Sequence, residues 1–450
     1  MSRPAAGERR VGIRAGRSTG RVPKKIHIVR EVLDSGVTVL VDPMEDVRSV
    51  ALGFFVRAGS VSEPPARQGL SHFLEHLLFK RTRRRSTVEI ATEIDRLGGD
   101  VDAFTTKEYT GFYCRTLDAR FERALDLVAD VVLSPAFRSS DVEVERGVIL
   151  EEIGEANDNP EDLAHENFVR ALWKDHPLGA PILGTAETVG AIRKEDLESY
   201  YAARYRPDNL IVAVAGRIRP VAAVAALERA FRRRRGGRRR RTREETAPRA
   251  HAHVLVRPRP GLEQAHVCFG MAGSSLTSPR RYAAGLLDAI LGGGMSSRLF
   301  QEVRERRGLV YTIGSSLAAY RHGGYESVSA ACAPRHLERV LEVTLKELRR
   351  LRRGGVRPRE LAWAKENLTG SLMLSLESTV SRMSSAARQQ FYFGRVEPIE
   401  ETLRRVDAVT LGDIDAEAER VLGSGSLSVS IVGNVGRLRL KPSDLASAIA

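Results

Sequence analysis

Residues 210–216, Leu-Ile-Val-Ala-Val-Ala-Gly, return in altered form at residues 427–433 as Leu-Ser-Val-Ser-Ile-Val-Gly. A second pair of segments agrees, with Arg-Ala-Gly-Ser at residues 57–60 and Met-Ala-Gly-Ser at residues 271–274. Each member of this second pair follows an apolar, strand-like stretch and leads through proline towards a helical pattern. The two pairs are offset by 217 and 214 positions, and this agreement indicates an internal duplication.

Within each half, strand patterns alternate with amphipathic helical patterns. Residues 86–89, Ser-Thr-Val-Glu, form a capping box ahead of an apolar stripe that ends at Gly98 and Gly99. Residues 118–133 predict a second helix with one apolar face. Short β-branched stretches predict strands at residues 37–41, 102–106 and 210–215. We therefore predict an α+β fold of two homologous α/β domains, each a mainly antiparallel sheet packed with helices.

The 450 residues exceed what one hydrophobic core usually organises, and an arginine-rich run divides them. We expect a disordered basic tail at residues 1–25, an N-terminal domain at 26–231, a linker at 232–250 and a C-terminal domain at 251–450.

The formal net charge of +14 would be typical of a nucleic-acid-binding protein if it were spread over the whole chain, but it is concentrated in two segments. Residues 1–30 supply +8 and residues 232–243 supply +9, which leaves the remaining body near −3. Because such basic appendages are usually solvated, nucleic-acid binding is the less favoured prediction. The three cysteines are far apart, and the chain has no long apolar run or secretory signal, so we expect a cytoplasmic protein with no membrane partner.

The most specific chemical feature is an HxxEH motif at residues 72–76. At helical spacing His72 and His76 face the same way and can meet one metal ion, while Glu75 leans towards the same open position. The offset of 214 places the apolar residues Leu286, Ala289 and Ile290 opposite this trio. The polar residues are therefore not needed for helix packing, and we predict a metal site in the first half only.

A catalytic zinc usually has a third protein ligand, and an acidic segment further along the chain offers candidates. We expect Ser139, Ser140 and Asp141 to cap a helix there. Glu145 and Glu152 are seven residues apart and share a face of that helix. Spacing alone does not choose among the five acidic candidates, which are Glu143, Glu145, Glu151, Glu152 and Glu155.

These residues resemble the insulinase, or pitrilysin, family of zinc metallopeptidases, and in particular its short branch that includes mitochondrial processing peptidase. The resemblance spans residues 37–435. It rests on three blocks in order: residues 69–76 with the HxxEH motif, residues 145–153, and residues 291–300 running into 304–311.

The resemblance implies a residue-by-residue assignment. Glu152 would be the third zinc ligand and Glu145 the second-shell glutamate that assists the site. Arg304 and Tyr311 would hold the substrate backbone. The substrate-pairing strand edge, usually Asn-Ala in the family, falls on Asp102, Ala103, Phe104 and Thr105, where the aspartate adds a charge.

The expected reaction is hydrolysis of peptide bonds with one Zn²⁺ per chain and Glu75 as general base. The resemblance further implies a half-clamshell that encloses peptides as a dimer. Because this chain carries both the HxxEH motif and the Arg/Tyr element, we favour a homodimer over a heterodimer. Two alternatives remain: a non-catalytic assembly subunit of the same fold, like the core subunits of cytochrome reductase, and a basic nucleic-acid-associated protein.

Overall fold

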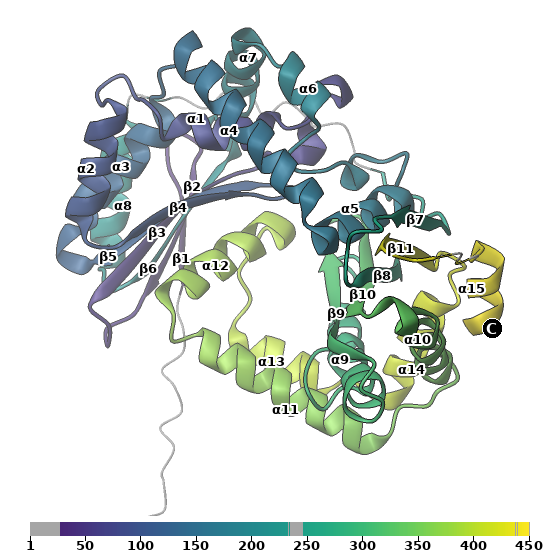
Figure 1. The fold of residues 1–450 in the computed structure, drawn as a ribbon. Coiled ribbons are helices and arrows are strands. Elements are labelled where there is room, and N and C mark those ends of the chain that lie inside the picture. The colour runs from purple at the N-terminus through teal and green to yellow at the C-terminus, as the bar shows by residue number, and fades with distance from the viewer. Residues whose placement is uncertain (1–27, 233, 235–245, 437, 439, 450) are drawn as a thin grey trace, which may run out of the picture.

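The computed structural model describes residues 28–232, 234, 246–436, 438 and 440–449. The predicted tail at residues 1–25 and most of the predicted linker lie outside the described residues. Each half of the chain builds one sheet, and the two sheets lie at an angle to each other with helices around them (Figure 1).

The first sheet has six strands in the order β1-β2-β6-β3-β5-β4. Only the pair β2–β6 is parallel; the other neighbours are antiparallel. The central strand β6 is apolar and buried along its whole length, whereas β4 lies at the edge. The strands are β1 (Val29–Val32), β2 (Thr38–Pro43), β3 (Ser49–Val56), β4 (Asp100–Thr105), β5 (Thr110–Leu117) and β6 (Leu210–Gly216).

The second sheet repeats this arrangement with five strands in the order β7-β11-β8-β10-β9. Again one pair, β7–β11, is parallel and the others are antiparallel. The strands are β7 (Val254–Pro258), β8 (Ala265–Ala272), β9 (Val310–Ala319), β10 (Gly324–Cys332) and β11 (Ser428–Gly433). Because β2, β6, β3, β5 and β4 correspond in order to β7, β11, β8, β10 and β9, the predicted duplication and α+β class are confirmed.

The helices of the first half are α1 (Leu70–Leu78), α2 (Thr87–Leu97), α3 (Phe121–Leu133), α4 (Ser139–Asp158), α5 (Pro160–Leu172), α6 (Ala186–Ala191), α7 (Lys194–Arg204) and α8 (Pro220–Phe231). Those of the second half are α9 (Arg281–Leu291), α10 (Leu337–Arg352), α11 (Pro358–Ser375), α12 (Thr379–Phe393), α13 (Ile399–Asp407), α14 (Leu411–Leu422) and α15 (Pro442–Ile449). Short helical turns include η1 (Ser60–Ser62), η2 (Pro65–Arg67), η3 (Asp118–Arg120), η4 (Pro177–Gly179), η5 (Pro207–Asn209) and η7 (Pro334–His336), and η6 (Phe300–Glu305) is a π-helical turn.

The predicted helix start is confirmed for α2 and wrong for α4. The capping box of Ser86 and Glu89 is present, and Gly98 ends α2 in the left-handed region. The prediction that Ser139, Ser140 and Asp141 cap α4 is wrong, because all three are already helical and Arg138, in extended conformation, is the N-cap. None of the helices in the described part of the chain is both long and apolar enough to cross a membrane.

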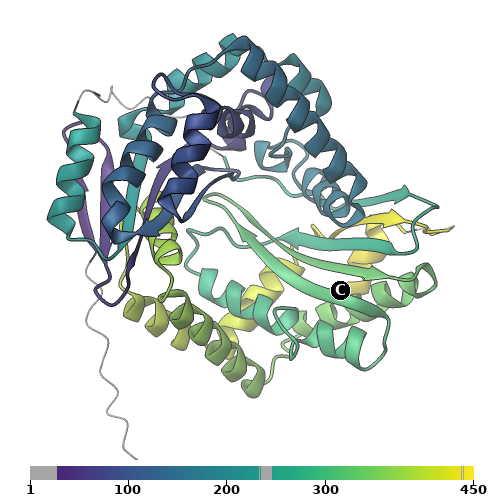
Figure 2. The same cartoon turned by 60° about the vertical axis from the view of Figure 1, so that its left-hand side comes forward.

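The two halves exchange one helix each. Helix α12 of the second half packs against β3 and β6 of the first sheet, and α5 of the first half packs against β8 and β11 of the second (Figures 1 and 2). The repeat offset places α12 opposite α5, so the exchange is reciprocal. Each sheet therefore completes one of its faces with a helix from the other half.

A glycine in each sheet allows the exchanged helix to approach closely. A Cβ atom on Gly53 of β3 would lie 2.9 Å from Met383 Sδ of α12. A Cβ atom on Gly270 of β8 would lie 2.2 Å from the Phe168 ring of α5. A larger residue at either position would therefore displace the helix.

Polar contacts reinforce this junction. Asp42 of β2 is buried and pairs with the guanidinium of Arg382 on α12, with Arg382 Nε donating to Asp42 Oδ2 at 2.6 Å. Near the C-terminal end of α12, buried Glu108 accepts a hydrogen bond from the Tyr392 hydroxyl and from the Arg321 backbone N–H. The halves are thus joined by a shared core and by buried charges.

Candidate active site

Helix α1 carries the HxxEH motif, and a buried carboxylate fixes its start. Glu63 accepts hydrogen bonds from the backbone N–H groups of Gly69 and Ser71, each at 2.7 Å. These are two of the donors that the first turn of a helix leaves unpaired, and a negative group is favourable there. The opposite face of α1 is held by Phe73, Leu74, Leu77 and Leu78, which are buried in the first core.

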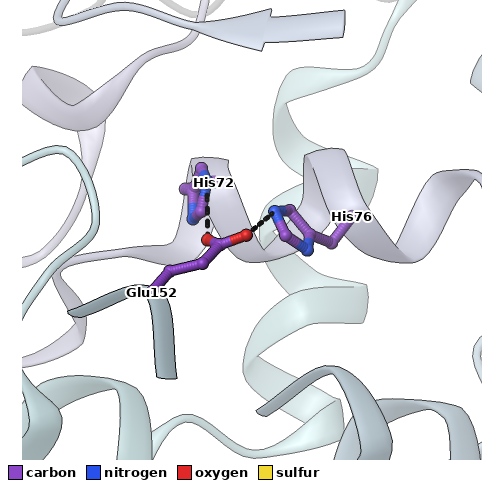
Figure 3. Close-up of side chains that lie close together, drawn as sticks. All are labelled: His72, His76 and Glu152. Carbon is purple, nitrogen blue, oxygen red and sulfur yellow. Dashed lines mark ion pairs between the residues drawn. The ribbon is translucent and has the colours of Figure 1, made fainter. Parts of the chain in front are cut away.

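The two histidines of α1 and Glu152 of α4 converge (Figure 3). One ligand atom from each of the three residues can be chosen so that all lie within 4.8 Å of one another. The Nε2 atoms of His72 and His76 are 3.7 and 3.6 Å from the two oxygens of Glu152. The structure thus brings together His72, His76 and, of the five acidic candidates, Glu152.

Glu145 lies two helical turns before Glu152 and orients one of the histidines. Its Oε2 is 3.1 Å from His76 Nδ1, which leaves His76 Nε2 facing Glu152. Its Oε1 is 2.6 Å from Lys80 Nζ. The Glu145 side chain is only 2% exposed, so its charge is balanced locally by these two neighbours.

The electrostatic environment shifts the pKa values of the two imidazoles in opposite directions. Burial, together with repulsion from His76, lowers the pKa of His72 to about 4. Burial also opposes charge on His76, but the hydrogen bond with Glu145 and the nearby carboxylates raise its pKa. For Glu145, burial is outweighed by hydrogen bonds from His76 and Lys80, so its pKa is lowered. His72 is therefore neutral, as a metal ligand must be, whereas the raised pKa of His76 means that a metal ion has to displace a more tightly held proton there.

Glu75 lies on the same helix and faces the edge strand β4. Its Oε2 accepts a hydrogen bond from the Thr105 hydroxyl at 2.5 Å. Burial raises the pKa of Glu75, and the Thr105 hydrogen bond offsets this only in part. A carboxylate with a raised pKa is better suited to accept and release a proton.

The predicted substrate edge, residues 102–105, lies in β4. Because β4 is the outermost strand, only one of its sides pairs with a neighbour, β5, among the described residues. Asp102 is exposed; its carboxylate accepts hydrogen bonds from the Ala103 N–H at 2.8 Å and the Tyr113 hydroxyl at 3.2 Å. Ala103 and Phe104 are partly buried.

Arg304 and Tyr311 form a separate pair on η6 and β9. The Arg304 guanidinium lies 5.2 Å from the Tyr311 ring centroid and 4.7 Å from that of Phe300. Tyr311 is 76% exposed. In the described part of the chain, the polar and ring contacts of both residues stay within the second half, so the structure does not bring them to the histidines.

The second half has no counterpart of the metal cluster in the described residues. Helix α9 occupies the position of α1, and its Leu286 and Ile290 are buried where the first half has histidines. Only the group His72, His76 and Glu152 meets the geometric requirement for a metal site among the residues described.

Two family models match the chain in succession. Residues 38–186 match the model described as insulinase (peptidase family M16), and residues 191–368 match the model of the peptidase M16 inactive domain. A protein from Mycobacterium tuberculosis, named as an uncharacterized zinc protease, is 39% identical over 426 residues, which cover 93% of this chain and 96% of that protein. The chain belongs to the insulinase (M16) peptidase family.

Solved structures agree with this family fold. The structure of a protease from Helicobacter pylori superimposes with a TM-score of 0.84 at 20% identity and covers 90% of this M16 chain and 99% of that one. A chain of complex III2 from Candida albicans gives a TM-score of 0.80 at 19% identity and covers 94% and 100%. At these identities the two structures support the fold alone.

Three contacts of this M16 site were not anticipated from the sequence. They are Glu63 at the start of α1, Lys80 on Glu145, and the Thr105 hydroxyl on Glu75. Lys80 stands four residues after His76, a helical spacing that offered a signal. Glu63 and Thr105 gave none, since both contacts depend on how loops and sheet pack around the helix.

Proposed function

We propose that the chain is a zinc-dependent endopeptidase that hydrolyses peptides or unfolded segments. The observation that carries this proposal is the convergence of His72, His76 and Glu152 beside Glu75 and an open strand edge. The relatives named as zinc proteases support it.

The donor set fits one zinc ion per chain. Two ligands about 2.0–2.1 Å from a tetrahedral ion lie about 3.4 Å apart, close to the 3.6 and 3.7 Å separations found here. His72, His76 and Glu152 would hold the ion, and Glu145 would keep His76 in its binding tautomer. When bound, Zn²⁺ lowers the pKa of a water ligand towards about 7 and polarises a carbonyl group.

The remaining steps belong to residues of the chain. Glu75 takes a proton from the attacking water and delivers it to the leaving amine. The peptide adds as a strand to residues 102–105 of β4, and its backbone supplies the hydrogen bonds that position it. Arg304 and Tyr311 donate hydrogen bonds to the carbonyl region, where negative charge develops.

Since the contacts of Arg304 and Tyr311 remain in the second half, we propose that they act across a homodimer, each pair facing the metal site of the other subunit. A heterodimer with a related subunit is the alternative. Mixing His72→Ala with Tyr311→Phe chains should restore one intact site per mixed dimer. No recovery of cleavage, with subunit exchange verified, would contradict sharing between subunits.

The decisive experiment combines metal analysis with cleavage of a mixed peptide pool. Wild type should contain zinc and lose cleavage on chelation, and Glu75→Gln should keep zinc but lose cleavage. Glu155→Gln is the matched control, because Glu155 is exposed on α4. Unimpaired cleavage by Glu75→Gln would remove the assigned role.

The competing assignments lead to different results. A non-catalytic assembly subunit, the role suggested by the fold shared with complex III2, would bind partner chains without hydrolysis. For a nucleic-acid-associated protein, deleting residues 232–243 would abolish salt-dependent nucleic-acid binding; an endopeptidase should tolerate that deletion. The domain division at residues 232–250 and a cytoplasmic location are part of the proposal, and limited proteolysis and fractionation test them.

A further inference from the structure

One hydrogen bond joins the substrate edge to the general base. Thr105 is the last residue of β4, and its hydroxyl donates to Glu75 Oε2 at 2.5 Å. Glu75 makes no other side-chain hydrogen bond with the described residues. The carboxylate is therefore oriented from the strand and not from its own helix.

The surroundings of Glu75 make such a bond consequential. His76 favours the negative charge of Glu75, whereas burial and the nearby Asp102 and Glu152 disfavour it. A glutamate has three rotatable side-chain bonds, so repulsion can turn it towards solvent. The Thr105 hydroxyl opposes this, since it is a neutral donor that ties one carboxylate oxygen in place and leaves the other for a proton.

We propose that Thr105 is a positioning residue that orients Glu75 and couples this orientation to peptide pairing along β4. The inference rests on the proposed peptidase function. A peptide added to the strand edge orders β4 up to Thr105, and the same strand then holds the base in line with the bond to be cleaved. The contribution lies in proton transfer, so loss of the hydroxyl affects kcat and leaves KM nearly unchanged.

The sheet supplies a matched control directly opposite. Thr110 of β5 is the register partner of Thr105, so the two side chains share a face of the sheet. The Thr110 hydroxyl is buried and donates to the Ala58 carbonyl at 2.9 Å. A Thr→Val change there removes a comparable hydrogen bond from the same strand pair without touching Glu75.

The kinetic test uses Thr105→Val, Thr105→Ser and Thr110→Val, assayed on one quenched fluorogenic peptide that wild type cleaves. Thr105→Val should lower kcat by about 10- to 100-fold, part of the 10²–10⁴ that general base catalysis supplies. Its KM should stay within about twofold, with equal zinc content. Thr105→Ser should recover most of kcat, and Thr110→Val should keep it. A wild-type kcat in Thr105→Val, no rescue by serine, an equal loss in Thr110→Val, or loss of zinc would each overturn the proposal.

A structural readout separates this inference from the proposed function. Crystal structures should show the Glu75 carboxylate displaced in Thr105→Val and in its original place in Thr105→Ser and Thr110→Val. An undisplaced Glu75 in Thr105→Val would overturn the positioning role even if the peptidase function stands. If wild type itself fails to cleave any peptide while holding zinc, the proposed function falls, and the positioning role falls with it.

Discussion

Removing the Glu145 carboxylate tests how the site holds its metal. Glu145 makes two contacts, with His76 Nδ1 at 3.1 Å and Lys80 Nζ at 2.6 Å. Glu145→Gln keeps an oxygen that can accept from His76 but loses the charge opposite Lys80. Glu145→Ala loses both contacts, so the two variants separate the orienting hydrogen bond from the charge.

The expected losses of zinc affinity follow from the role of Glu145 and from the solvent exposure of Lys80. Loss of a residue that orients a ligand typically weakens metal affinity by about 10–100-fold, or about 1.4–2.7 kcal/mol. Lys80 is 34% exposed, so solvent screens part of its unpaired charge. We therefore expect the lower end, about tenfold, for Glu145→Gln, and about 100-fold for Glu145→Ala, whose His76 is free to rotate.

The assay is zinc competition against a fluorescent chelator of known affinity at fixed pH and salt. Glu143→Gln is the matched control on the same helix, because Glu143 is exposed and pairs only with Arg146 in the described residues. A thermal melt without metal checks that each variant folds. Zinc affinity of Glu145→Ala within twofold of wild type would refute the reasoning that Glu145 holds His76 for the metal.

Three further predictions concern the junction and the strand edge. Met383→Ala removes a fully buried side chain from the face that α12 presents to the first sheet, and it should cost about 2–5 kcal/mol of unfolding free energy. Denaturant titration should show one shared transition; an unchanged first transition beside a shifted second one would contradict the exchange of helices. Asp42→Asn leaves the Arg382 guanidinium buried without its charge partner, and it should lower the unfolding free energy by about 3–5 kcal/mol in the same assay. The control is Glu122→Gln, which breaks an exposed pair with Arg229 and should change the unfolding free energy by less than about 0.5 kcal/mol. Asp102→Asn removes an exposed negative charge from the substrate edge, so kcat/KM for a lysine-rich peptide should fall relative to that for a matched glutamate-rich peptide. The wild-type preference for the lysine-rich peptide should also shrink at about 1 M salt. A preference that neither the substitution nor the salt alters would show that Asp102 does not recognise substrate charge.

Much of the fold and the metal cluster could be predicted because their signals are local. The spacing of His72 and His76 places two imidazoles on one helix face, and the seven-residue spacing of Glu145 and Glu152 does the same for the carboxylates. The repeated segments indicated two similar sheets. Choosing Glu152 from five acidic residues needed the family resemblance, because every exposed acidic helix looks alike in a single sequence.

The helix exchange and the Thr105 contact could not be predicted in this way. The apolar side of α12, with Met383, Ala386 and Ala387, has the pattern of any amphipathic helix, and periodicity does not say which sheet it covers. Likewise, a threonine at the end of a strand has no local feature that points to a glutamate thirty residues earlier. Both features arise only when distant segments pack together.

The reciprocal exchange of α5 and α12 also constrains how the chain matures on the ribosome. The last strand of the first sheet ends at Gly216, but the helix that covers one of its apolar faces begins only at Thr379. During translation that face, which includes Leu40, Phe55 and Ile211, stays exposed until the second half has been synthesised. A truncated product that ends before α12 therefore carries every proposed zinc ligand but leaves an apolar face of its sheet exposed to solvent. Such a face is a binding site for chaperones and quality-control proteases.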